Sequence, residues 1–375
     1  MEKDYLDRER LVADFFAGYE ADPLIIDPEE FFLVEKNGIM DAEIVSGLQK
    51  AMESVLGKGC FVIINDESIN ACAMEKDGVP IIALYAGTIK KIFCDAGIMM
   101  LSDEFLTGVG ELGACYHDIR ADDHGLRVDK ENDFVLKMDI SGDHIRETVG
   151  YMIASLALHF IIYHEMGHHK LGHIRKLKEK YNLFYQEALS AEISEEYAEE
   201  RKQMELDADL YAADMLVEKM DSLMESWGEL LDIDFGYSEI FQLLIPALVL
   251  IKENLPMGAY SVEEIESNFY LPNIIRIAIT AMVVARKPHI KEVLWNDILA
   301  VFLEDEEYRK QFEAENDMVV LDDSNQLTET AFERFYALMI AGTEQVYTKI
   351  FVGNYFPALF QTDIKAMNWF LHLYK

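Results

Sequence analysis

The sequence predicts an α+β protein, with a small β-sheet in its first third and long helices after it. Short runs rich in β-branched and aromatic residues are concentrated between residues 60 and 86. From residue 147 onward the chain is dense in Ala, Leu, Glu, Met and Lys, which favour helices. Hydrophobic residues make up 51% of the 375 positions, with only 21 Gly and 8 Pro, so a packed core is expected rather than disorder.

The strand signals predict one strand followed by a hairpin. The first run is Cys60 to Ile64, which is short, apolar and rich in β-formers. Two further runs, Ile69 to Met74 and Val79 to Ala86, flank the turn sequence Lys76-Asp77-Gly78. The next segment, residues 102–145, mixes Gly and Asp with short apolar pieces, and loops with one strand at Phe134 to Met138 are expected there.

The remaining segments are expected to be helical. Residues 1–57 are expected to form helices broken at Pro23 and Pro28, with apolar residues at helical spacing in Ala42 to Leu56. One continuous helix is predicted from Glu147 to about Tyr181, and another from about Ser194 to Trp227. Residues 237–375 are expected to be all-helical, with interruptions at Pro246, Pro256, Pro272, Pro288 and Pro357. We therefore divide the chain into an N-terminal helical segment, 1–57, a core, 58–235, and a helical C-terminal region, 236–375.

Charge and apolar patterning limit the partners and the compartment. With 33 Lys and Arg against 69 Asp and Glu, the formal charge is −36, so nucleic acid is not an expected partner. The N-terminus lacks a cationic start followed by an apolar stretch, and the apolar runs at 151–163, 241–251 and 277–285 are shorter than the roughly 18–20 residues that a spanning helix needs. No CxxC pair occurs among Cys60, Cys72, Cys94 and Cys115. We expect a cytoplasmic protein with reduced thiols and no transmembrane segment; the sequence does not indicate an oligomeric state.

The sharpest chemical feature is His164-Glu165-Met166-Gly167-His168, an HExxH motif on a predicted helix. The i, i+4 spacing puts the imidazoles of His164 and His168 on one face, one turn apart, where both can reach one metal ion. Glu165 lies beside them and can act as the general base that takes a proton from water. About 0.03 such matches are expected by chance in a chain of this length and composition. The alternative is a pair of hydrogen-bonded core histidines.

A catalytic zinc site needs a third protein ligand and an open fourth position. Glu205 and Asp209 share a face of the next predicted helix, with the small residues Ala208 and Ala212 nearby. On this arrangement Glu205 binds the metal and Asp209 accepts the free N–H of a ligand imidazole, that of His164. The alternative for Glu205 is a solvated acidic helix. His169 and His173 are interpreted as packing or supporting residues, because His173 is half a helical circle away from His164.

Two motifs together resemble a known group of enzymes. Residues 164–173 read HExGHxxxGH and residues 205–209 read ExxAD, a pair found in HtpX-like and CAAX prenyl protease-like zinc metallopeptidases, a branch of the gluzincins. Asn70-Ala71-Cys72-Ala73, followed by a strand from Val79 to Ile89, resembles the NAFA segment of that family, with Cys72 where an aromatic residue is usual. These motifs span residues 60–215, under half of the chain.

The resemblance implies a zincin-like metallopeptidase core with one Zn²⁺ per chain and a largely α-helical C-terminal extension. Carried over by position, His164, His168 and Glu205 bind zinc, Glu165 is the catalytic base, and Asp209 orients a ligand. The segment Asn70, Ala71, Cys72 and Ala73 would be an edge strand that pairs with a polypeptide substrate; the alternative is an internal hairpin strand. Family members carry His-Pro before an Arg, whereas here Tyr270-Leu271 precedes Arg276, so Tyr270 is a candidate oxyanion donor.

The leading functional hypothesis is a soluble zinc-dependent endopeptidase that hydrolyses peptide bonds with a metal-activated water and Glu165 as general base. A narrower form of it is a regulatory protease that cuts one intracellular protein. The alternative from another class is a zinc-stabilised, non-catalytic scaffold or binding protein with a vestigial peptidase site. Retention of Glu165 argues against that alternative, because a structural metal site does not need a base.

Overall fold

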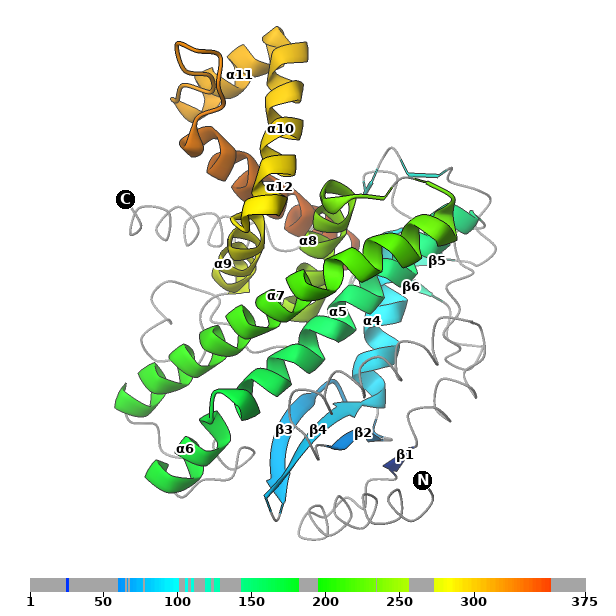
Figure 1. Cartoon of the computed structure of the whole chain (residues 1–375). Coiled ribbons are helices and arrows are strands. Elements are labelled where there is room, and N and C mark those ends of the chain that lie inside the picture. The colour runs from blue at the N-terminus through cyan, green and yellow to red at the C-terminus, as the bar shows by residue number, and fades with distance from the viewer. Residues whose placement is uncertain are drawn as a thin grey trace.

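The computed structural model describes most of the segments on which these expectations depend. Within them the chain is mostly helical with a small sheet, which agrees with the α+β class (Figure 1). Several expectations lie outside the described residues: the helix at Ala42 to Leu56, the strand at Phe134 to Met138, Tyr270, and the interruptions at Pro23, Pro28, Pro256, Pro272 and Pro357. The described residues are 25–26, 60–64, 66, 68–76, 78–100, 105–106, 109–110, 119–122, 125–128, 143–181, 195–233, 235–255 and 273–351.

The sheet contains the predicted strand and hairpin. Its strand order is β1 (Ile25–Ile26), β2 (Cys60–Ile64), β4 (Val79–Tyr85) and β3 (Ala71–Lys76). β2 pairs with β4 in parallel, and β3 pairs with β4 antiparallel across a turn in which Gly78 has φ of +76°. β3 therefore lies at one edge of the described sheet. β1 lies between the expected breaks at Pro23 and Pro28, and the other residues of 1–57 are outside the described ones, so the helical expectation for that segment stays a prediction.

Two further segments differ from the sequence expectations. The strand that was expected to continue to Ile89 ends at Tyr85, and α4 (Ala86–Met99) begins in its place. Ile89, Ile92, Phe93 and Ala96 recur at helical spacing and are buried, so burial of this stripe favours a helix. Residues 102–145 also contain an antiparallel hairpin, β5 (Ile119–Asp122) with β6 (Gly125–Val128), where loops were expected. Such short strands are stabilised by pairing with one another, which cannot be predicted from the residues of either strand alone.

The centre of the fold is α5 (His144–Lys170), which contacts α4, α7 (Glu195–Leu231), α8 (Tyr237–Asn254) and the β3–β4 hairpin (Figure 1). The Asp143 side chain caps it by accepting the backbone N–H of Arg146 at 2.9 Å. The predicted single helix to Tyr181 is wrong, because α5 ends at Lys170 and α6 (His173–Tyr181) follows. Gly172, with φ of +75°, adopts the left-handed conformation that ends the helix.

α5 also bears on the expectation of no transmembrane segment. It is long and apolar enough to cross a bilayer, whereas 78% of its most apolar window is buried inside the fold. Central helices of water-soluble proteins have the same length and composition. The absence of a spanning segment therefore stays a prediction.

The described residues 237–255 and 273–351 are mostly helical, as expected, with one isolated β-bridge between Leu321 and Leu327: α8, α9 (Asn273–Ala285), α10 (Pro288–Glu304), α11 (Glu306–Asn316) and α12 (Glu329–Phe351). Figure 1 shows α10 and α11 at the end of the molecule that is remote from the sheet. Pro246 does not interrupt the chain but lies inside α8, while Pro288 occupies the first turn of α10, where its missing N–H costs nothing. One core cluster includes residues from α4, α5 and α7 to α12. The division into three parts stays a prediction.

Candidate metal centre

The two histidines of the HExxH motif lie near the C-terminal end of α5 with their rings facing one another. The Nε2 atoms of His164 and His168 are 3.1 Å apart, and both side chains are buried. The ring planes meet nearly edge to face, with centroids 4.8 Å apart. The helix therefore presents two imidazole nitrogens to one point, as the i, i+4 spacing requires.

α7 brings a carboxylate to the same point. The oxygens of Glu205 lie 3.3 Å from His164 Nε2 and 3.7 Å from His168 Nε2. One ligand atom from each of these three residues lies within 4.8 Å of the others, and all three residues are buried. The expected convergence of HExxH with ExxAD is thus present in the geometry, and Glu205 is not on a solvated face.

Close packing of α5 on α7 makes this convergence possible. Gly167, inside the motif, lies against α7, where an added Cβ would be 3.1 Å from Ala208 Cα and 3.3 Å from Tyr211 Cβ. Ala208 and Ala212 are completely buried between the helices. Small residues on both helices therefore let the backbones approach and bring Glu205 within reach of α5.

Asp209 orients the first histidine, and Arg276 of α9 holds Asp209. His164 Nδ1 lies 2.9 Å from Asp209 Oδ1. Arg276 donates to Asp209 through Nε at 2.6 Å and through Nη2 at 3.0 Å, in a bidentate pair. When Nδ1–H of His164 donates to Asp209, the lone pair of Nε2 is directed at the site.

The sequence did not predict Arg276 as a site residue. It identified Arg276 only as the Arg that follows Tyr270-Leu271. The signal that could have found it is its isolation, because it is the only charged residue in α9, whose sequence is NIIRIAITAMVVA. A lone arginine on an otherwise apolar helix must find a buried anion. Arg276 contacts two buried carboxylates, since its Nη2 atom is also 3.5 Å from Glu205 Oε2.

Opposing electrostatic effects set the ionisation of the three ligand residues. Burial alone would raise the pKa of Glu205, but Arg201, at 3.1 Å, and the two histidines hold it well below its ordinary value. Burial likewise disfavours the charged form of both histidines. The pKa of His168 is lowered well below its ordinary value, whereas hydrogen bonds to Asp209 and Glu205 outweigh burial and raise the pKa of His164. Glu205 is therefore an ionised ligand group, and His168 a neutral one.

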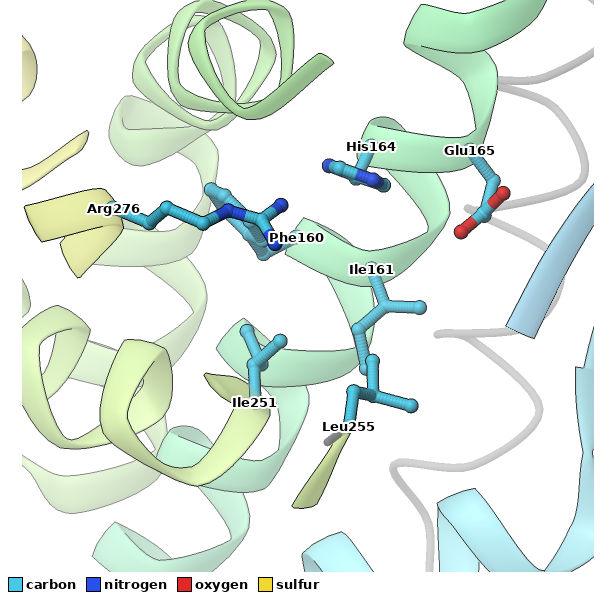
Figure 2. A pocket seen from close by; sticks show the side chains of 7 residues that line it. All are labelled: Phe160, Ile161, His164, Glu165, Ile251, Leu255 and Arg276. Atoms are coloured by element: carbon cyan, nitrogen blue, oxygen red, sulfur yellow. The ribbon is translucent and has the colours of Figure 1, made fainter. Parts of the chain in front are cut away.

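The Glu165 side chain points away from that of His164, on the side of α5 that faces the sheet, as Figure 2 shows. It is buried, and its Oε2 atom has no hydrogen-bond partner among the described residues. Burial raises the pKa of Glu165 to about 7, although a hydrogen bond from the backbone of Ala73 opposes the rise. A buried carboxylate oxygen without a partner is costly. The Oε2 atom of Glu165 can accept a hydrogen bond from a molecule, such as water, that binds beside it.

The donor set fits a tetrahedral zinc ion. With zinc–ligand bonds of about 2.0–2.2 Å, two tetrahedral ligand atoms lie roughly 3.3–3.5 Å apart. The two Nε2 atoms are 3.1 Å apart, Glu205 Oε2 lies 3.3 Å from His164 Nε2, and Glu205 Oε1 lies 3.7 Å from His168 Nε2, so each imidazole has one carboxylate oxygen near the tetrahedral spacing. The charge balance is also compatible with a divalent cation. The carboxylates of Glu205 and Asp209 face the guanidinium groups of Arg201 and Arg276, and Glu165, whose pKa is about 7, adds negative charge when it ionises.

A small cavity adjoins the site between α5, α8 and α9 (Figure 2). It has about 320 Å³ of empty space, part of which is open to solvent. Apolar side chains form most of its wall, and three site residues complete it. The lining residues are Phe160, Ile161, His164, Glu165, Ile251, Leu255 and Arg276.

The segment 70–73 lies at the edge of the sheet formed by the described residues, beside α5. Asn70 is joined to β4 and α4, because its carbonyl accepts Tyr85 N–H at 3.1 Å and its N–H donates to Thr88 Oγ1 at 2.7 Å. Ala71 N–H donates instead to the Asn70 side chain at 2.9 Å, and the backbone of Ala73 bonds to Glu165. Backbone groups of Ala71 and Ala73 thus face away from β4, toward α5.

The other histidines near the motif have separate partners. His169 Nε2 lies 3.1 Å from the carbonyl of Ile81 and joins α5 to β4, while His159 Nδ1 lies 2.8 Å from the carbonyl of Ser155 in its own helix. His173 contacts His168 through the two Nδ1 atoms, at 3.0 Å. His173 is thus nearer the site than its nine-residue spacing from His164 suggested, because the helix breaks between them.

Comparison with known proteins supports a peptidase. Residues 131–245 match the family model described as Peptidase U49, a stretch that contains the HExxH motif, Glu205 and Asp209 and covers under a third of the chain. No match was found among curated proteins or among solved structures. The family match supports a peptidase function with polypeptide substrates, without specifying the gluzincin branch.

Because Gly167 lies against α7, replacing it with alanine is expected to destabilise the protein, although alanine normally favours a helix more than glycine does. Gly167→Ala should lower the free energy of unfolding by about 1–3 kcal/mol, because the methyl group forces α5 and α7 apart. The matched control is Gly342→Ala in α12, where an added Cβ meets nothing within 4 Å. That change should stabilise the protein by up to about 1 kcal/mol. Urea unfolding measures both, and equal effects would contradict the close approach.

Proposed function

We propose that this chain is a zinc-dependent endopeptidase of the gluzincin type, in which His164, His168 and Glu205 bind the metal. The observation that carries the proposal is the buried convergence of these three groups beside a cavity that His164 and Glu165 line. The Peptidase U49 match supports the peptidase part of the proposal. Zinc, the gluzincin branch and the likeness to HtpX-like enzymes rest on the motifs and on the donor geometry.

Zinc, when bound, would polarise the scissile carbonyl and make water more acidic. The chain's own residues then do the rest. Glu165 takes a proton from the attacking water and delivers it to the nitrogen of the leaving amine. A pKa near neutrality suits both steps, since a group near pH 7 can accept and release a proton. A bound cation would lower this pKa, which favours the proton-accepting form.

Arg276 and Asp209 support this chemistry without contacting the reacting atoms. Their bidentate pair holds the carboxylate against His164 Nδ1 and keeps the Nε2 lone pair directed at the metal position. Arg201 and Arg276 also keep Glu205 ionised in a buried setting. The site is thus organised before any substrate arrives, which is what electrostatic catalysis requires.

Glu165 also favours an enzyme over a zinc-stabilised scaffold. A structural zinc site is closed by four protein ligands, whereas the described residues offer three. A scaffold would also gain nothing from a buried carboxylate with an unsatisfied oxygen beside those ligands. Loss of that carboxylate should therefore stop the reaction and leave metal binding intact.

We also propose that the substrate binds as an additional strand along β3. β3 is the edge strand of the described sheet, and it lies against α5 next to Glu165. The N–H groups of Ala71 and Ala73 already donate to Asn70 and Glu165, so we propose that their outward carbonyls accept from an extended peptide and set its scissile bond beside the metal position. Backbone pairing of this kind accepts many side-chain sequences.

The metal assignment predicts about one zinc per chain, because three protein ligands converge at one point. His164→Ala, His168→Ala and Glu205→Ala should each reduce the zinc content to a small fraction of that value. His289→Ala is the matched control, since His289 is exposed on α10 and remote from the motif in sequence. Elemental analysis of the purified variants tests this. Wild-type protein without bound zinc at micromolar free zinc would contradict the proposal.

The role of Glu165 is tested by Glu165→Gln, which keeps the size of the side chain and removes the base. Peptidase activity should fall by at least about 100-fold, while zinc affinity stays within twofold of wild type. Glu229→Gln, an exposed change on α7, is the control and should leave both unchanged. Cleavage of a peptide library and zinc titration give the two readouts. Undiminished cleavage by Glu165→Gln would remove Glu165 from the mechanism.

Strand addition predicts an alternating pattern in substrate backbone modification. Each backbone N–H of a cleaved peptide is replaced in turn by N–CH₃. Only every second position should raise KM, because alternate residues of an extended strand point their N–H groups at the neighbouring strand. Steady-state kinetics across the series measures the effect. A uniform effect, or none, would contradict pairing with β3.

A further inference from the structure

His173 is a buried imidazole outside the proposed ligand group that contacts one of its members. It is the first residue of α6, and its Nδ1 atom lies 3.0 Å from Nδ1 of His168. The two rings meet close to edge-on, with centroids 5.1 Å apart and planes at 67°. The contact is therefore a directed hydrogen bond between two imidazoles in the interior.

The break between α5 and α6 brings His173 to this position. In a continuous helix, five residues correspond to about 140° of rotation, so His173 would lie on a different face from His168. The left-handed Gly172 ends the helix instead, and Gly172 N–H donates to the carbonyl of His169 at 3.1 Å. The chain then reverses and α6 starts with its first side chain directed back at α5.

Packing of α6 on α7 fixes the position of His173. Leu177 is buried with Tyr197 and Met204 in a small apolar cluster between the two helices. At the far end of α6, Tyr181 donates to Glu200 at 2.8 Å. α7 thus positions both Glu205 and the helix that carries His173.

We propose that His173 is a positioning residue, which accepts the Nδ1–H of His168 and so directs the Nε2 lone pair of His168 at the metal position. The inference rests on the proposed function, because it assigns His168 as a ligand through Nε2. Only one proton can lie between the two Nδ1 atoms. Metal binding through Nε2 requires that this proton stay on Nδ1 of His168. Nδ1 of His173 is then the hydrogen-bond acceptor, and the ring proton of His173 is on its Nε2 atom.

His173 is not a ligand for the same ion. It contacts the Nδ1 side of the His168 ring, whereas His164 and Glu205 face the Nε2 side. The two ligand histidines therefore have different partners. His164 donates to the carboxylate of Asp209, and His168 donates to a neutral imidazole. Partners of this kind fix the tautomer and ring orientation of a ligand.

Three substitutions at His173 separate hydrogen bonding from packing. Asn places its Oδ1 atom near the position of the His Nδ1 atom, so His173→Asn should bind zinc within about threefold of wild type. His173→Gln, whose oxygen is one bond further out, and His173→Leu should bind about 10–100-fold more weakly. His159→Leu is the control, since His159 is on α5, as His168 is, but bonds to Ser155, and this change should not alter affinity. Competition with a chromophoric chelator measures all four.

The tautomers are read directly from long-range ¹H–¹⁵N spectra of ¹⁵N-labelled, zinc-loaded wild-type protein. His168 should show a proton on Nδ1 and His173 a proton on Nε2. A proton on Nδ1 of His173, or wild-type affinity in a folded His173→Leu variant, would overturn the inference and leave the proposed function standing. If wild-type protein does not bind zinc, both the inference and the proposed function are overturned. The titration of the wild type alone shows this, without any variant.

Discussion

The carboxylate of Glu205, buried between two helices, is the constraint on which the rest of the site depends. An ionised carboxylate is expensive to remove from water unless charges and hydrogen bonds compensate for the loss. Here Arg201 and Arg276 approach it from α7 and α9, and two imidazoles face it from α5. Three helices, α5, α7 and α9, thus have to meet around one functional group. α5 and α7 can approach closely only because Gly167 and Ala208 carry little or no side chain.

Each element next to α5 contributes a different polar group to the site. α7 carries the acidic ligand and also Asp209, which orients His164. α9 contributes a single charged residue, Arg276, which neutralises both carboxylates. α6 contributes His173, which faces the second histidine. The edge strand β3 adds a backbone donor at Ala73 that reaches Glu165. The proposed catalytic base is therefore held between the helix that would bind the metal and the strand that would bind the substrate.

Several parts of the fold were predictable because short-range patterns specify them. The β3–β4 hairpin follows from two β-rich runs around a Gly-containing turn, and the long α7 follows from a stretch rich in Glu, Ala, Leu and Met. Other parts were not predictable in this way. The extension of β4 into α4 and the hairpin β5–β6 depend on which surfaces become buried and which strands pair. The break at Gly172 was missed because helix formers continue on both sides of it.

The sequence by itself determined the pair of imidazoles and the neighbouring carboxylate on α5, since i, i+4 spacing places two side chains on one face of any helix. Helical spacing likewise put Glu205 and Asp209 on one face of α7. Only the tertiary structure decided that this face meets the histidines, that Arg276 reaches both carboxylates, and that His173 contacts His168. These residues come from separate helices, and periodicity within a helix says nothing about which helices pack together. That choice is made by burial of apolar surface and by the need of buried charges for partners.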